Sequence, residues 1–254
     1  MKLTILGCGT SSGVPRIGND WGACDPAEPR NRRRRVSILV EHQDTRILID
    51  TSPDLREQLL DADVADVDAV IWTHDHADHC HGIDDLRQLF HARGAPIAGY
   101  ARGATLDSLR ARFTYAFEGK GGYPPVVDGR LLPDAFTVGP IDVRITDQPH
   151  GDIVSAGIRF DVDGTSIGYS TDVNILTGDM IDLFEGVDVW VIDALRHRPH
   201  PTHPHLSQAL EWIETVMPGR ALLTHMDNSM DYAVLRASLP EDVEPAYDGL
   251  EVVL

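Results

Sequence analysis

Histidine and aspartate side chains crowd into one short stretch of the chain. Between Ile71 and Ile83 the sequence reads WTHDHADHCHG, with four histidines and two aspartates inside the eight residues from His74 to His81. Such a stretch is either a solvated polar loop or a metal site. Imidazole nitrogen and carboxylate oxygen are ligands that borderline divalent metals accept. The rest of the sequence has to decide between these two interpretations.

The candidate ligands extend beyond this stretch. Four of them follow the β-rich run VDAVIWT and precede a helix, which predicts a strand-to-helix loop where side chains converge: His74, His76, Asp78 and His79. Two metal ions would need about six to eight protein ligands, so more must come from elsewhere. Three further candidates end other β-rich runs: His150 in TDQPHGD, Asp172 in GYSTDV and His225 in ALLTHMD.

The order and spacing of these residues resemble a known family. His-x-His-x-Asp-His followed by His, Asp and His is the defining pattern of the metallo-β-lactamase superfamily, and the resemblance spans nearly the whole chain. It implies an α+β fold, a four-layer αββα sandwich, in a single domain over residues 1–254. It also implies two divalent metal ions, zinc first and manganese as the alternative. One ion would be held by His74, His76 and His150, the other by Asp78, His79 and His225, with Asp172 bridging.

A narrower similarity concerns the loops. The N-terminal LGCGTSSGVPRIGNDWGACDPAEPRNRRRRVS, the run HPHLS and the terminal AYDGLEV are similar to the branch of phosphoribosyl 1,2-cyclic phosphate phosphodiesterases. In that branch a further histidine assists catalysis near the substrate phosphate. His205, at the start of a helix whose amino end favours an anion, is the matching position. It is preferred over His203 of the same loop for this role. Asp78 is assigned a catalytic role besides metal binding.

The same branch often carries a structural zinc, held by cysteines of the N-terminal loop and a later histidine. Here only Cys24 remains in that loop, and Asn228 stands at the later position, so we predict that this zinc is missing. The chain has three cysteines, far apart, which favours neither a disulfide framework nor a cysteine-only zinc site. Asp50, which ends the run RILID, is a candidate support for a metal-bound histidine.

Charge counting favours phosphoryl chemistry. Two divalent cations carry more charge than Asp78, Asp172 and a bridging hydroxide remove, and an anionic phosphodiester would neutralise the remainder. We therefore predict a phosphodiesterase that hydrolyses a small cyclic or diester phosphate by attack of metal-bound hydroxide, with His205 assisting the leaving oxygen. Carbonyl hydrolysis, as in glyoxalase II-like thioesterases or lactonases, is the alternative because it shares every metal ligand.

The net charge of −18 bears on two further alternatives. It disfavours a tRNA- or RNA-processing nuclease, because nucleic-acid binders show a basic footprint. A degenerate protein that only binds a ligand is disfavoured because all seven ligands are present. One basic island stands out: RNRRRR, from Arg30 to Arg35. It is either a strand edge paired with acidic residues or a phosphate-recognition patch, in which case Arg34 and Arg35 bind substrate.

The elements that must position these residues alternate along the chain. Short β-rich runs outnumber the helices, of which GIDDLRQLFHA and LSQALEWIETVM have the clearest apolar spacing, and this mixture predicts sheets covered by helices. Asp163-Gly164 predicts a hairpin turn. Gly7 and Gly9 interrupt the apolar start before a signal-peptide core could form, so we expect a cytoplasmic protein with no membrane partner. The expected partner is a small phosphorylated substrate. The sequence leaves the oligomeric state open, with a homodimer as the assembly considered.

Overall fold

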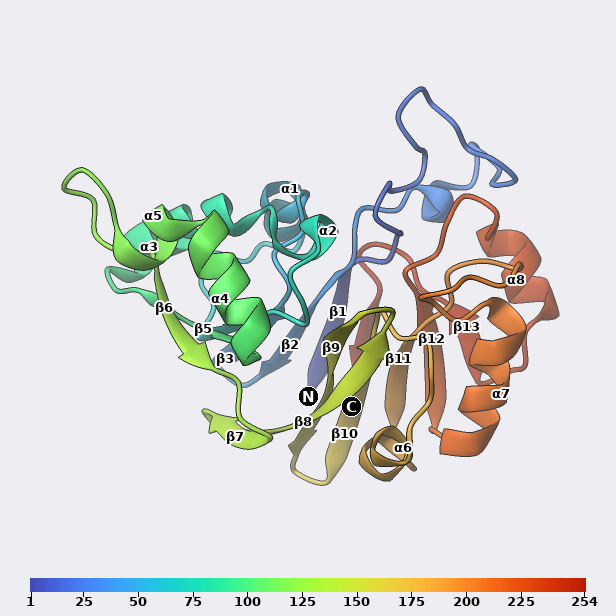
Figure 1. Ribbon diagram of the computed structural model, residues 1–254. Coiled ribbons are helices and arrows are strands. Elements are labelled where there is room, and N and C mark those ends of the chain that lie inside the picture. The colour runs from blue at the N-terminus through green and yellow to red at the C-terminus, as the bar shows by residue number, and fades with distance from the viewer.

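Two seven-stranded mixed sheets pack face to face in the computed structural model, which describes residues 1–254 (Figure 1). The first sheet has the strand order β14 (Glu251–Val253), β1 (Lys2–Gly7), β2 (Ser37–His42), β3 (Thr45–Ile49), β4 (Ala69–Ile71), β5 (Ile97–Ala101), β6 (Val127–Leu131). The second has the order β13 (Val243–Pro245), β12 (Arg220–Thr224), β11 (Val189–Asp193), β10 (Thr165–Ser170), β9 (Ile153–Val162), β8 (Ile141–His150), β7 (Ala135–Val138).

Helices cover the outer face of each sheet (Figure 1). The first sheet carries α1 (Leu55–Asp61), α2 (Ala77–Cys80), α3 (Leu86–Arg93), α4 (Gly103–Arg112) and α5 (Thr114–Glu118). The second carries α6 (Gly178–Phe184), α7 (Leu206–Val216) and α8 (Tyr232–Ser238). Two short 3₁₀ helices, η1 (Pro29–Asn31) and η2 (Ile83–Asp85), lie in the connections. The predicted four-layer αββα sandwich is therefore confirmed.

Alternation along the strands builds the core between these layers. Ile47 and Ile49 of β3 belong to a cluster of 45 buried apolar residues that also contains Ile158 and Phe160 of β9, in the other sheet. Leu48, between them, points the opposite way into a second cluster of 18 residues under α1–α5. Each such side chain, fully buried, stabilises the fold by about 1.5–3 kcal/mol. A period of two thus places one central strand between two apolar layers.

The turn and one of the two helices predicted from the sequence have the expected boundaries. The hairpin turn between β9 and β10 has Asp163 and Gly164 at φ 52° and 79°, the left-handed values that such a turn requires. Helix α7 follows the predicted LSQALEWIETVM segment and ends at Val216, where Met217 is left-handed and Pro218 follows. The run GIDDLRQLFHA is divided into η2 and α3 instead of forming one helix. No helix combines the length and the apolar character that a membrane span requires.

Both sheets contain parallel strands whose carboxyl ends meet at one edge of the sandwich. Strands β3 to β6 are parallel in the first sheet and β10 to β13 in the second. A backbone hydrogen bond from Ala156 N to Thr73 O, 3.0 Å, joins the two sheets close to this edge. Loops that leave the carboxyl ends of parallel strands are where ligand-binding side chains collect. The sequence candidates should therefore meet here.

Candidate active site

The seven predicted ligands converge at this edge of the sandwich. Their ligand atoms form groups in which all atoms lie within 4.8 Å of one another. The first group consists of His74, His76, His150 and Asp172, and the second of Asp78, His79 and His225. A further group contains Asp172, Asp193, His203 and His225. Residues from both sheets contribute to the first two groups, so these groups exist only when the sandwich is assembled.

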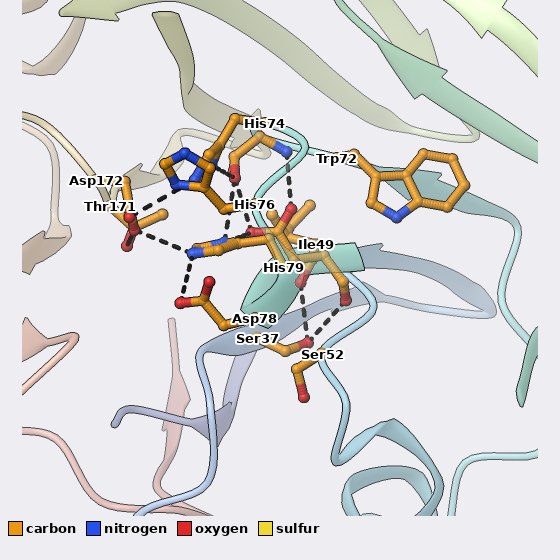
Figure 2. Close-up of polar contacts among 12 residues, drawn as sticks. Ser37, Ile49, Ser52, Trp72, His74, His76, Asp78, His79, Thr171 and Asp172 are labelled. Atoms are coloured by element: carbon orange, nitrogen blue, oxygen red, sulfur yellow. Dashed lines mark hydrogen bonds and ion pairs between the residues drawn. The ribbon is translucent and has the colours of Figure 1, made fainter. Parts of the chain in front are cut away.

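Asp172 of the first group also lies beside His79 of the second group (Figure 2). Its Oδ2 is 3.6 Å from Nε2 of His74 and 3.5 Å from Nε2 of His150. Its Oδ1 is 3.2 Å from Nε2 of His79 and 3.4 Å from Nε2 of His225. The two oxygens therefore face different groups, which is the arrangement that a bridging carboxylate requires.

Hydrogen bonds behind the histidines fix which nitrogen faces the site. Asp50 Oδ2 accepts from Nδ1 of His79 at 2.7 Å and from the Thr73 hydroxyl at 2.8 Å. Because that hydroxyl donates its proton to Asp50, it accepts from Nδ1 of His74, 3.1 Å away. Nδ1 therefore carries the proton in both rings, and Nε2 is left as the ligand atom. The supporting role predicted for Asp50 agrees with this geometry.

The remaining donor atoms fit a divalent cation. Nε2 of His74 and of His79 is buried with no hydrogen-bond partner, although leaving a buried polar atom unpaired costs about 1–3 kcal/mol. The His150 ring is held in the same way, with Nδ1 2.9 Å from the Thr202 carbonyl, so its Nε2 also faces the group. Unpaired imidazole nitrogens opposite a carboxylate are the donor set that zinc or manganese accepts.

Neighbouring charges and burial shift the pKa values of the site residues. Burial alone would raise the pKa of Asp172, but the charges of His225, His79 and His74 around it hold that pKa well below the usual range. Burial would lower the pKa of His225, yet Asp172 and the hydrogen bond to Asp78 raise it to about 9. Burial, together with the charge of His79, lowers the pKa of His74 well below the usual range. Protons on some histidines thus balance the carboxylates, and a bound cation would displace them.

Three of the site residues have strained backbones. Asp50, Asp172 and His225 have φ of 62°, 52° and 56°, in the left-handed region that residues with a side chain seldom adopt. Each comes directly or almost directly after a strand, where a sharp turn redirects the side chain toward the site. Such a conformation costs on the order of 1–3 kcal/mol per residue and persists only where surrounding structure enforces it. The fold therefore holds these side chains in place at a cost in stability.

His203, a member of the third group, lies beside the first two groups, where His205 was expected. Its Nδ1 is 2.7 Å from Oδ2 of Asp193, a fully buried residue at the end of β11. Its Nε2 points toward Asp172 and is 3.9 Å from Oδ2. The ring centroid lies 4.7 Å from that of His225 and 4.9 Å from that of His150. A histidine oriented by a buried carboxylate is the usual arrangement of a general acid or base.

His205 is placed differently from His203. It is the residue before the first turn of α7, and its side chain makes no hydrogen bond or ion pair. The backbone on either side of it is tied to the end of β11, through Leu195 N to the Pro204 carbonyl at 3.1 Å and Leu206 N to the Arg196 carbonyl at 2.9 Å. These bonds hold His205 at the helix start while the preceding bend turns His203 inward. His203, and not His205, is therefore the ring of this loop that faces Asp172.

Arg34 and Arg35 of the basic island Arg30–Arg35 pair with aspartates outside the groups of candidate ligands. Arg34 Nη2 is 2.7 Å from Asp61, and Arg35 Nε is 3.0 Å from Asp54, the residues at the two ends of α1. Neither arginine contacts a residue of the groups. The geometry therefore favours the strand-edge interpretation over substrate binding by Arg34 and Arg35.

Arg33 of the same island is buried, with only 2% of its surface exposed. Its guanidinium donates to the Met230 carbonyl at 2.6 Å, the Asp227 carbonyl at 3.4 Å and the sulfur of Cys24 at 3.9 Å. It joins the N-terminal loop to the turn that follows the ligand His225. Cys24 of that loop thus contacts a buried guanidinium.

Sequence reasoning missed two supporting features. Asp193 ends the apolar run VDVWVID as Asp50 ends RILID, and this parallel was a usable signal. The second feature is a set of contacts from α4 to the motif: Arg112 donates to the Asp75 carbonyl and lies 2.6 Å from Nε2 of His81. Asp75 and His81, which carry no ligand role, thus anchor the motif to the helical layer.

Residues 45–226 match the family described as Beta-lactamase superfamily domain. The chain belongs to the metallo-β-lactamase superfamily. With its histidine and aspartate groups, membership of this superfamily indicates a hydrolase with a divalent metal site.

Three relatives extend the comparison. A crystal structure described as a new diphosphatase from the PhnP family is 34% identical, with a TM-score of 0.91, over 99% of this chain and 96% of that one. A curated octanoyltransferase of Porphyromonas gingivalis (strain ATCC BAA-308 / W83) is 33% identical over 264 residues, which cover all of this chain and 52% of that protein. This superfamily member thus spans about half the length of that relative. Human tRNase Z, short form, shares the fold, with a TM-score of 0.74 and 18% identity over 100% of this chain and 99% of that one.

Proposed function

We propose that this hydrolase is a dinuclear metal-dependent phosphodiesterase acting on small cyclic or diester phosphates. The observation that carries the proposal is the His203–Asp193 pair, with Nε2 of His203 3.9 Å from the carboxylate that lies between the two ligand groups. Breaking a phosphodiester expels an alkoxide, a strong base that needs a proton. A thioester expels a thiolate, which is stable near neutral pH without one. A positioned acid therefore favours phosphodiesters over thioesters.

The ligand groups define what bound metals would contribute. Two divalent cations, zinc or manganese, would supply Lewis acidity toward a phosphoryl oxygen and would lower the pKa of a water molecule. His74, His76 and His150 would hold one, and Asp78, His79 and His225 the other. Asp172 would contribute one oxygen to each. The partly neutralised cations favour an anionic substrate, as the charge count from the sequence also does.

The residues of the chain then have separate tasks. Asp193 accepts from Nδ1 of His203, which fixes the orientation of the ring. Nε2 is thereby the nitrogen that gives its proton to the leaving oxygen. Asp50 and Thr73 hold the rings of His74 and His79, so that the ligand nitrogens keep their direction during the reaction.

A substrate panel tests the proposal. Protein reconstituted with zinc or with manganese is assayed on bis(p-nitrophenyl) phosphate and small alkyl cyclic phosphates, beside thioester and lactone substrates. We expect kcat/KM for the phosphodiesters to exceed that for the carbonyl substrates. Activity confined to the carbonyl substrates would overturn the proposal. The carbonyl panel also covers the acyl chemistry in the name of the octanoyltransferase, of which this chain matches about half.

His203→Asn sharpens the same assay. p-Nitrophenolate leaves without a proton, whereas an alkoxide needs one, so the variant should lose far more activity on alkyl cyclic phosphates than on bis(p-nitrophenyl) phosphate. Equal losses on both would argue against a proton donor at this position. Phosphoanhydrides form a second substrate class, favoured by the diphosphatase that is 34% identical over 99% of the chain. Because phosphate is a good leaving group, His203→Asn should lose about as little activity on a phosphoanhydride as on bis(p-nitrophenyl) phosphate.

A further inference from the structure

A second basic segment borders the candidate active site. It is Arg196–His203, with the sequence RHRPHPTH, and it ends at the histidine that lies beside the ligand groups. Neither of its two arginines, Arg196 and Arg198, forms an ion pair, although the chain as a whole carries a net charge of −18. Positive charge that the protein itself does not neutralise is thus concentrated next to the site.

Contacts at both ends fix the shape of this segment. The Arg196 guanidinium donates to the carbonyls of Arg198 at 3.1 Å and Pro199 at 2.8 Å, which closes the turn on itself. At the other end, the Thr202 carbonyl accepts from Nδ1 of the ligand His150 at 2.9 Å. The segment is therefore held against the site by a bond to one of its ligands.

His200 is oriented by a backbone group that can only donate. The Thr202 amide N–H donates to Nδ1 of His200 at 3.3 Å, so Nδ1 is the unprotonated nitrogen of that ring. The proton of the neutral imidazole then lies on Nε2, which has no partner in the protein. The His200 ring is next to that of His203, with 5.1 Å between the centroids. An unused donor is thus fixed beside the general acid.

We propose that His200 is a substrate-binding residue, which donates from Nε2 to a phosphoryl oxygen, and that the exposed Arg198 adds the charge that attracts the phosphate ester. This inference rests on the proposed function, because it names the residues that would recognise the anionic substrate. A neutral donor that is already aligned loses little entropy on binding. Hydrogen bonds to charged groups are worth about 1.5–3 kcal/mol, which corresponds to about 10–150-fold in affinity.

Three variants and a matched control test it. His200→Ala removes the donor, His200→Gln keeps an N–H at a similar reach, and Arg198→Met removes the exposed charge. His91→Ala removes an exposed histidine on α3, far from the segment in the chain. Metal content and thermal unfolding are measured for each. Binding of inorganic phosphate to the metal-loaded proteins is measured by calorimetry, and KM and kcat are measured on a cyclic phosphate.

We expect His200→Ala to raise both the Kd of phosphate and KM by about tenfold or more, with a smaller change in kcat. His200→Gln should stay within about threefold of the wild type, and Arg198→Met should weaken phosphate binding most at low salt. Nitrogen-15 NMR of the wild-type imidazoles should show the proton of His200 on Nε2. A proton on Nδ1, or phosphate binding by His200→Ala equal to that of His91→Ala, would overturn the inference.

The two proposals can fail separately. If the wild type hydrolyses only carbonyl substrates while His200→Ala still weakens phosphate binding, the proposed function fails and the binding site stands. If phosphodiesters are hydrolysed and His200→Ala matches the His91→Ala control, the function stands and the inference about His200 fails.

Discussion

The two basic segments, Arg30–Arg35 and Arg196–His203, look alike in sequence and differ in what their charges face. In the first, Arg34 and Arg35 pair with aspartates at the ends of α1, and Arg30 lies over the ring of Tyr232 with 4.8 Å to the centroid. In the second, the Arg196 guanidinium binds only carbonyls of its own turn, and His203 faces the ligand groups. The density of positive charge along a chain therefore does not locate an anion site. What matters is whether carboxylates of the protein have already neutralised that charge.

Arg33 shows what the first segment does instead. Its buried guanidinium ties the N-terminal loop to the Asp227 and Met230 carbonyls, just after His225. A fixed cation surrounded by backbone acceptors can hold a loop in the way that a structural metal does. The first segment thus stabilises a loop near the site, and the second presents groups to the site.

The largest expected effect concerns the end of the second segment. His203→Ala should lower kcat on an alkyl cyclic phosphate by about 10²–10⁴-fold, because the leaving oxygen loses its proton donor. His205→Ala, two residues away, should change kcat by less than about threefold. Steady-state kinetics of the two variants with equal metal content check this. A larger loss in His205→Ala would restore the role expected from the sequence.

Arg33→Met should reduce the free energy of unfolding by about 3 kcal/mol, since the carbonyls of Asp227 and Met230 would lose a charged donor inside the protein. Arg32→Met is the matched control, because Arg32 lies over Trp21 and makes only an exposed cation–π contact, worth about 0.5–1 kcal/mol. Urea denaturation of both variants measures the difference. Equal midpoints would remove the structural role given to the first segment.

The metal affinity of the ligand groups should depend on pH, whereas the charge of the arginines in the basic segments should not. His225, with its pKa raised to about 9, binds a proton in the metal-free protein at neutral pH, and a cation must displace it. Metal affinity should therefore rise with pH, by about tenfold per unit for each proton displaced, up to about pH 9. Competition with a chelator at several pH values measures this, and calorimetry in two buffers measures proton release. A metal affinity that stays constant between about pH 6.5 and about pH 8.5 would contradict the proton displacement expected from the raised pKa of His225.

The smallest effect is expected at Arg34 and Arg35. Changing both to Gln should lower the free energy of unfolding by about 1 kcal/mol or less per ion pair, because the pairs are partly exposed. kcat/KM on a cyclic phosphate should stay within about twofold of the wild type, since neither side chain contacts the groups. A tenfold fall in kcat/KM, on the order of 1.4 kcal/mol, would instead assign the first segment to the substrate.

The fold and the positions of the candidate ligands could be predicted from patterns in the sequence. His74, His76, Asp78 and His79 lie in one strand-to-helix loop, so their spacing alone fixes which side chains can turn together. The later candidates each follow an apolar strand, and parallel strands of a sandwich end at a shared edge. Alternation of apolar residues specified the strands in the same way. Patterns with a short period therefore carried this part of the prediction.

Only the tertiary structure decided which histidine of the loop faces the candidate ligands. His203 and His205 share an irregular loop, where no periodicity says which ring turns inward, and a contact with Asp193 at the end of β11 settles it. The partners of Arg34 and Arg35 lie at the two ends of α1, about twenty to thirty residues along the chain. The candidate ligands could be located in the sequence because four of them are close together and the other three each follow an apolar strand. Neutralisation of charge was decided by the fold, because it depends on which carboxylates long-range packing brings within reach of each cation.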